Sequence, residues 1–341
     1  MRLDILAADG GALYKFRLRP PGGAEVTRSA VLSQGRRWRI LKSLGQLAPF
    51  VGASPFHIPR PERGEAAART LGELMGALIP TDIVQELQQQ RDRARRLELA
   101  PESCLLPWEL ARPVEGMCLA EAFTCTRFLG ARPTGAQPLS GSLRALLVLD
   151  PERLQSWYQE EASAIMDSLG PAWKFDLLSG PQATVSGVRA ALDQGRCGLC
   201  HILAYADAAV ESPDLSRIHL ADGALRPLFG RTHPPAAPRL VCLHFNVAGE
   251  AQPGCPGMAL ANTWATAFGA LGTETVLVTQ WELPSDLTRS FFSALYRGLS
   301  RGDSLASALQ AARSVVAQRG GTLASQAVVA YGPLDWKAAD L

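Results

Sequence analysis

Residues 240–249, LVCLHFNVAG, decide the fold of this 341-residue chain. The stretch opens with apolar residues that do not alternate with polar ones, which predicts a strand buried on both faces of a sheet. Similar apolar runs recur throughout the second half of the chain, at residues 145–150, 173–178, 200–206, 239–245, 275–281 and 327–331. Helical spacing separates them, as in Leu260, Trp264 and Phe268. Strands that alternate with amphipathic helices predict an α/β fold with a mostly parallel sheet covered on both faces.

The first half of the chain has a mixed pattern. Leu3 and Ile5 alternate with polar residues, residues 9–11 (DGG) form a turn signal, and a second alternating run follows, so we expect a β-hairpin. Residues 66–79 and 83–94 have helical spacing with a break at Pro80, and Asp82 is positioned to cap the second helix.

The segment ARPTGAQPLSGS, residues 131–142, is rich in proline, glycine and hydroxyl residues and predicts a domain boundary. We therefore expect a smaller α+β domain over residues 1–140 and an α/β domain over residues 141–341.

The charge balance disfavours polyanionic partners. With 34 basic and 32 acidic residues the formal charge is only +2, so no strong field attracts nucleic acid or acidic lipid. The longest weakly polar stretch, residues 258–271, is too short to span a bilayer, and the N-terminus shows no secretory signal. We expect a cytoplasmic protein without membrane association. Seven cysteines, an odd number, favour free thiols over a disulfide framework.

Three strand ends resemble motifs of one family. The chain has LAYADAA at 203–209, LVCLHFNVAG at 240–249 and TQWELPSD at 279–286. In the CHAT family of caspase-like cysteine peptidases, which are often attached to TPR repeats, the corresponding strands end in HFAGHG, LSACETG and LWPVDD. Weaker matches follow the same order, at residues 97–110 (LELAPESCLLPWEL), 220–223 (LADG) and 290–312.

The resemblance, which covers about residues 70–332, implies a caspase-like three-layer α/β/α sandwich with a mainly parallel six-stranded sheet. We expect the smaller N-terminal domain to pack against this sandwich, as would follow if the LPWEL segment inserts Leu106 and Trp108 into a core that the two domains share.

The same resemblance implies that the chain has lost its peptidase chemistry. The family's histidine takes a proton from its cysteine at the end of the neighbouring strand, which requires the two to lie within about 2.6–3.2 Å. Here the histidine position is Ala208 and the cysteine position is Asn246, while Asp207 and Ala209 replace the flanking glycines. Neither a methyl group nor an amide can do this chemistry. The expected function is that of a catalytically inactive pseudopeptidase, acting as an adaptor, scaffold or regulator.

The alternative is an active cysteine endopeptidase with a displaced nucleophile. Cys255 lies nine residues after Asn246 in a loop, and His244 or His233 would have to act as its base. The other interpretation is a buried loop thiol and a structural histidine. We expect Asp207, His244, Cys255 and Trp281 to lie at the cleft or at a partner-binding surface, although Trp281 also fits core packing.

Cofactor sites are not predicted. RCGLCH, residues 196–201, has the spacing of a haem attachment motif, but strand alternation should point Cys200 and His201 to opposite faces. Cys118 and Cys125 are not spaced as a zinc pair, and no nucleotide-binding glycine motif is present. We expect Glu160 and Glu161 on a helix surface.

The expected partner is a protein. An active caspase-like protein that pairs through a sheet edge is one candidate. A repeat protein on another chain, as part of a bacterial defence or signalling complex, is the other, since no 34-residue period is present here.

Overall fold

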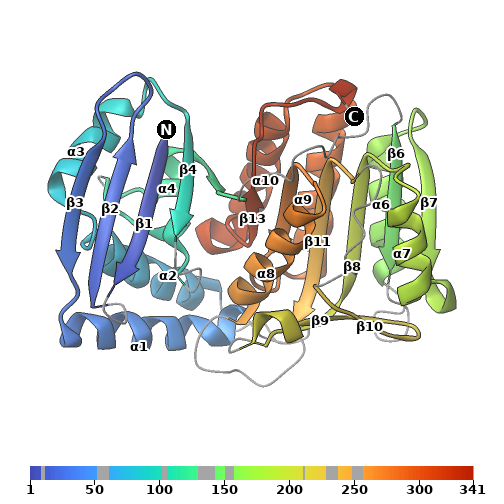
Figure 1. Cartoon of the computed structure of the whole chain (residues 1–341), viewed down its shortest axis with the longest axis horizontal. Helices are drawn as coiled ribbons and strands as arrows, with labels where there is room; N and C mark the ends of the chain where they lie inside the picture. Colours follow the sequence, from blue (N-terminus) through green and yellow to red (C-terminus); the bar gives the residue numbers. More distant parts are fainter. Residues whose placement is uncertain are drawn as a thin grey trace. The chain divides into compact units, whose positions relative to one another are not determined.

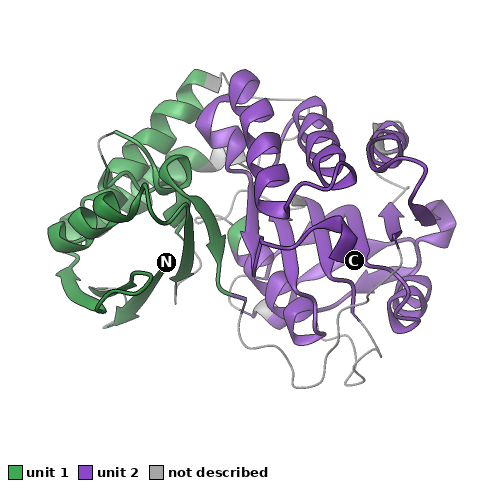
Figure 2. Ribbon diagram, turned by 90° about the horizontal axis from the view of Figure 1, so that it is seen from above, with its two compact units in different colours: residues 1–128, 251–258 green, residues 129–250, 259–341 purple. Residues whose placement is uncertain are grey.

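The computed structural model describes residues 1–8, 12–51, 61–101, 106–114, 116–129, 143–149, 157–209, 212–227, 237–247 and 256–340. The chain forms two compact units, coloured separately in Figure 2. Unit 1 comprises Met1–Phe128 with Ala251–Met258, and unit 2 comprises Leu129–Glu250 with Ala259–Leu341. The predicted boundary at residues 131–142 lies outside the described residues.

Unit 1 is an α+β unit whose described strands pair in the order β5-β4-β1-β2-β3. The predicted hairpin is confirmed, because β1 and β2 pair antiparallel with Leu3 opposite Leu18 and Ile5 opposite Phe16. The strands are β1 (Arg2–Ala8), β2 (Leu13–Arg19), β3 (Val26–Val31), β4 (Arg96–Pro101) and β5 (Thr124–Arg127), and the helices are α1 (Gln34–Val51), α2 (Pro61–Gly76), α3 (Thr81–Gln90) and α4 (Leu119–Ala122), as Figure 1 shows.

Asp82 does not cap α3, contrary to the sequence prediction. The N-cap position is Pro80, which has no side-chain cap, and Asp82 instead accepts a hydrogen bond from Arg28 Nε at 2.7 Å. The helix begins two residues earlier than its apolar periodicity indicated, and this places Asp82 within its first turn, where a carboxylate interacts favourably with the helix dipole.

The LPWEL segment is part of the core of unit 1. Trp108 is buried and makes edge contacts with the rings of Tyr14 and Phe16, at centroid distances of 5.9 and 5.8 Å. The next residue, Glu109, forms a buried two-bond ion pair with Arg127 on β5, with N–O distances of 2.7 and 2.8 Å. Two buried charges held in this planar geometry satisfy each other, so the segment is fixed by packing and by charge.

Unit 2 contains the predicted mainly parallel sheet. Its described strands pair in the order β7-β6-β8-β11-β12-β13, all parallel except β13, which is antiparallel to β12. A short hairpin of β9 and β10 continues from the end of β8. The strands are β6 (Arg144–Leu149), β7 (Lys174–Ser179), β8 (Leu199–Asp207), β9 (Arg217–Leu220), β10 (Gly223–Leu225), β11 (Leu240–Val247), β12 (Thr275–Thr279) and β13 (Val328–Tyr331).

Helices cover both faces of this sheet, which makes three layers. Neighbouring residues of β6 show the alternation: Leu147 packs in one apolar cluster with α6, α9 and α10, and Leu146 packs in a second cluster with α7 and α8. The helices are α6 (Trp157–Leu169), α7 (Val185–Asp193), α8 (Pro256–Ala270), α9 (Ser285–Ser300) and α10 (Leu305–Ser325). The predicted three-layer α/β/α arrangement is therefore confirmed. No helix in the described part of the chain combines the length and apolarity needed to cross a membrane.

Candidate functional site

The register of β8 and β11 brings the two positions of the predicted site to the same sheet edge. These strands are adjacent and parallel, with Asn246 opposite Tyr205 and Val247 opposite Ala206. Asn246 is the penultimate residue of β11, and Ala208 follows the last residue of β8. Ligand and catalytic sites of parallel sheets form beyond such carboxyl ends. Ala208 is partly buried and packs against the core cluster on the α7 and α8 face of the sheet.

The end of β8 is held by the strand that follows it. Asp207 Oδ2 lies 2.6 Å from His219 Nε2 on β9, and both side chains are partly exposed. Ser216 Oγ accepts a hydrogen bond from the backbone amide of Ala209 at 3.1 Å. Asp207, predicted as a cleft residue, is therefore partly accessible and in hydrogen-bond contact with His219. Sequence reasoning missed His219, although it lies directly before the LADG motif.

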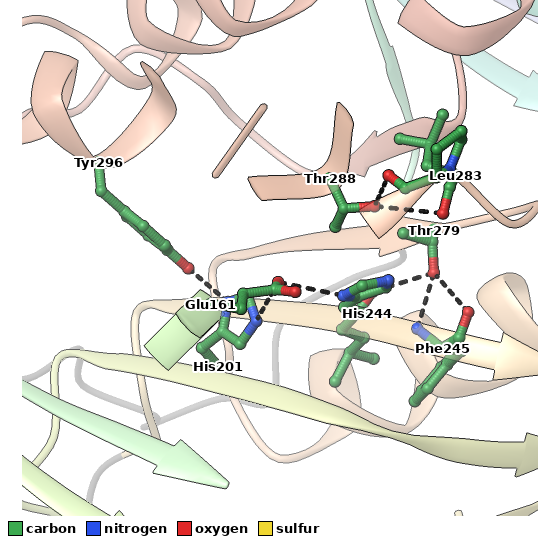
Figure 3. Close-up of polar contacts among 10 residues, drawn as sticks. Glu161, His201, His244, Phe245, Thr279, Leu283, Thr288 and Tyr296 are labelled. Carbon is green, nitrogen blue, oxygen red and sulfur yellow. Dashed lines mark hydrogen bonds and ion pairs between the residues drawn. The ribbon is translucent and has the colours of Figure 1, made fainter. Parts of the chain in front are cut away.

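The side chain of His244 points into the protein core. It is 1% exposed, and its Nδ1 lies 3.2 Å from Glu161 Oε1 on α6, as Figure 3 shows. The prediction that His244 lines a cleft or a partner-binding surface is thus corrected, because its imidazole lies under α6 and α9, where it packs against Phe292. Its nitrogen toward Glu161 is engaged by a buried carboxylate.

Glu161 also differs from the prediction. Only 1% of this residue is exposed, whereas we expected both Glu160 and Glu161 on the helix surface. The reason is its position four residues before Ile165, which places both on the sheet-facing side of α6. Only Glu160 is exposed, and it forms an ion pair with Arg289 at 2.6 Å.

A second buried histidine completes this polar cluster. His201 on β8 lies with Nδ1 2.7 Å from the Tyr296 hydroxyl and with Nε2 3.9 Å from Glu161 Oε1 (Figure 3). Burial lowers the pKa of His201 to about 4, which outweighs the opposing effect of Glu161. Burial also raises the pKa of Tyr296, so its hydroxyl keeps its proton. When neutral His201 accepts a hydrogen bond from this hydroxyl at Nδ1, its ring proton is on Nε2, which faces Glu161.

Burial makes three of the described thiols poor nucleophiles. The side chains of Cys118, Cys125, Cys197, Cys200 and Cys242 are buried. Burial raises the pKa of Cys197 and of Cys242 to about 12, and that of Cys200 well above its usual value. The thiolate is the nucleophilic form, so these three thiols are not activated. Cys255 and His233, the other candidates, lie outside the described residues.

The haem-like motif is split by the sheet, as predicted. Cys200 packs in the cluster on the α7 and α8 face, and His201 contacts Tyr296 and Phe292 on the α9 face. Within the part of the chain that the structure describes, no group of three acidic, cysteine or histidine residues is arranged to hold a metal ion.

Trp281 belongs to the core. It is 2% exposed, and its indole Nε1 donates a hydrogen bond to the Leu323 carbonyl at 3.1 Å. The expectation that it contributes to a cleft or partner surface is corrected, because the ring fills space beneath α10. Trp281 therefore has the core-packing role that the sequence analysis gave as the alternative.

The comparisons with known proteins agree with this architecture. The family described as "CHAT domain" matches residues 67–339. The crystal structure of the Arg-specific cysteine proteinase gingipain R is similar with a TM-score of 0.51 at 11% identity, over 78% of this chain and 70% of that one. The separase of the Saccharomyces cerevisiae separase–securin complex is similar with a TM-score of 0.54 at 9% identity, over 97% of this chain and 30% of that one.

The chain thus spans less than a third of the separase chain it resembles. No curated protein matches. At these identities the structural likeness concerns the fold alone.

Proposed function

We propose, since this chain belongs to the CHAT domain family, that it is a pseudopeptidase which binds a protein partner instead of cutting it. The observation that carries this proposal is the pair Ala208 and Asn246 at the carboxyl ends of two neighbouring strands. These are the positions at which the family's motifs place histidine and cysteine. A methyl group and an amide supply neither the base nor the nucleophile of a peptidase.

His244, the histidine on the same strand as Asn246, does not replace the missing base. His244 lies two residues before Asn246 on β11, but its Nδ1 contacts Glu161 within the core. Reaching the strand ends would require its side chain to leave the contact with Phe292 and to separate from a buried carboxylate. Leaving that carboxylate without its partner is costly in a nonpolar environment.

The buried thiols support the same conclusion. Cys242 lies four residues before Asn246 on the same strand, yet its pKa is raised to about 12 by burial. Where the members of a mutually dependent catalytic unit have been removed, the rate falls by a factor of about 10⁶. Residual peptide hydrolysis by this chain should therefore be negligible.

The accessible groups at the strand ends suit binding. Asp207 and His219 form a partly exposed pair of polar side chains, with Asp207 Oδ2 2.6 Å from His219 Nε2. Such groups contribute hydrogen bonds and specificity at the polar rim of a protein interface. The favoured role is that of an adaptor, scaffold or regulator, and the partner is a protein.

A thiol-reactive activity probe tests the proposal. The purified chain is incubated with a peptidyl acyloxymethyl ketone, alongside an Arg-specific cysteine proteinase as positive control and a Cys255→Ala variant. We expect no labelling of the chain under conditions that label the control completely, and no hydrolysis of fluorogenic peptides.

Stoichiometric labelling at Cys255, absent in Cys255→Ala and accompanied by peptide hydrolysis, would show an active endopeptidase with a displaced nucleophile and would overturn the proposal.

A further inference from the structure

The outer face of α1 in unit 1 exposes large apolar side chains. Trp38 is 61% exposed and Leu41 is 56% exposed. They are three residues apart and therefore neighbours on one side of the helix. The other side of α1 is already used, since Ile40, Leu44 and Leu47 are buried. Exposed tryptophan beside exposed leucine is unusual on a protein surface unless another molecule covers it.

The helix that carries this face is strongly basic. Residues 34–51 contain Arg36, Arg37, Arg39 and Lys42 and no acidic residue, in a chain whose net charge is only +2. None of these four cations pairs with a carboxylate within the described ranges. The ammonium of Lys42 lies over the Trp38 ring, 5.0 Å from its centroid. Arg37, Arg39 and Lys42 are exposed like the apolar pair, whereas Arg36 is partly buried and donates a hydrogen bond to the Ala77 carbonyl. Three of the four positive charges of α1 thus lie on its exposed side.

We propose that this surface, formed by Trp38, Leu41, Arg39 and Lys42, docks an acidic protein segment that carries an aliphatic or aromatic anchor. Carboxylates of the partner complement the arginine and lysine, and the anchor covers Trp38 and Leu41. Tryptophan and arginine are the residues that most often dominate binding energy at protein interfaces. This inference rests on the proposed function, because it requires a protein partner. It adds the surface at which that partner binds and the groups that hold it. The surface lies before residues 67–339, the part matched by the family.

Three other occupants fit this surface less well. A helix that lies in a membrane interface needs a continuous apolar face, and the larger apolar face of α1 is buried in unit 1. A second copy of the chain, related by a two-fold axis, would place the same basic patch against itself, which like charges oppose. A nucleic acid would contact an extended positive field, which a chain of net charge +2 does not provide.

The test uses the full chain and a fluorescein-labelled 14-residue peptide in which glutamate and leucine alternate. Binding is measured by fluorescence anisotropy at about 0.05 and 0.5 M NaCl. Two comparison peptides carry lysine in place of glutamate or serine in place of leucine. We expect the acidic, apolar peptide to bind, the other two to bind at least about tenfold more weakly, and high salt to weaken the complex.

Variants assign the binding to α1. Trp38→Ser with Leu41→Ser, and separately Arg39→Glu with Lys42→Glu, should each weaken binding at least about tenfold. The matched control is Leu177→Ser with Arg189→Glu, which also removes an exposed leucine and reverses an exposed arginine, but in unit 2. This control should leave binding unchanged. Because all changed residues are exposed, circular dichroism should show folded protein in every case.

Several results would overturn the inference. They are equal binding of all three peptides, unchanged binding by both α1 variants, a concentration-dependent dimer that the Trp38 variant abolishes, or α1-dependent binding to vesicles containing 30% phosphatidylserine. Failure here is distinguishable from failure of the proposed function, because labelling by the ketone probe reports on the strand ends of unit 2 and not on α1.

Discussion

His201 should make the stability of the protein depend on pH in a defined window. Its pKa is lowered to about 4 by burial, while an unfolded chain has the usual value of 6.5. As the pH falls below 6.5 the unfolded chain takes up a proton that the folded chain resists, so stability declines until the pH reaches about 4. Above pH 6.5 this residue contributes no pH dependence. Tenfold in proton affinity is about 1.4 kcal/mol, so the full loss is about 3 kcal/mol, of which about 2 kcal/mol has occurred at pH 5.

The variant His201→Gln isolates this contribution. Glutamine does not titrate, and it retains a group that can hydrogen-bond to the Tyr296 hydroxyl, which lies 2.7 Å from Nδ1 of His201. The other groups around the site, Glu161, His244 and Cys242, are the same in both proteins. Urea denaturation followed by circular dichroism between pH 4 and pH 7.5 gives the free energy of unfolding for each.

The wild-type protein should lose about 3 kcal/mol more than the variant over this range, whatever their difference at pH 7.5. Parallel curves would refute the assignment of a neutral, desolvated His201, since carboxylate titrations affect both proteins equally.

Three further outcomes follow from the described contacts. Glu109→Ala should destabilise the protein by about 3–5 kcal/mol in urea denaturation, because it removes the carboxylate that holds the buried Arg127 with two hydrogen bonds. Glu109→Leu with Arg127→Leu should lose much less, and equal losses would argue against a buried-charge origin. Gly332→Ala should be more destabilising than Gly302→Ala. Both glycines have a positive φ, but only the methyl group added at position 332 would clash with a backbone oxygen, that of Glu274. Equal melting temperatures of the two variants would contradict this. At pH 8, Cys197 and Cys242 should react with iodoacetamide about 10³-fold more slowly than a model thiol, because burial raises their pKa to about 12. Mass spectrometry measures the alkylation. Full alkylation of the native protein within minutes would show that these thiols are not buried as described.

The strands of unit 2 could be predicted from the sequence because both faces of each strand are covered. Residues such as Leu146 and Leu147 are equally buried on opposite faces, so their run is continuous and differs from any surface segment. Unit 1 gave weaker signals. The edge strand β3 (Val26–Val31) is largely exposed, and α1 mixes a buried stripe with an outer face that holds both Trp38 and arginines. Neither element was predicted, since a pattern of one buried face is obscured when the other is also partly apolar.

The candidate site was predictable in place but not in its surroundings. Strand ends could be located because each apolar run stops at Asp207 or near Asn246, and the pairing of β8 with β11 follows from their parallel arrangement. The burial of Glu161 was harder to predict, because a charged residue on an amphipathic helix is usually exposed. One signal was available: Glu161 lies four residues before Ile165 and so falls on the helix face that was assigned to the core. Its partners, His201 and His244, come from strands far away in the sequence.

The buried histidines and position 208 contribute differently to the stability of the sheet. Position 208 lies beyond the last paired residues of β8 and β11, which are Ala206 and Val247, so the side chain there adds little to the sheet's stability. His201 and His244 lie within the paired strands, where their contacts with Glu161 and the aromatic residues of α9 are part of the core. Replacement of Ala208 should therefore change stability by less than replacement of the buried histidines. The fold alone consequently constrains position 208 less than it constrains the buried histidines.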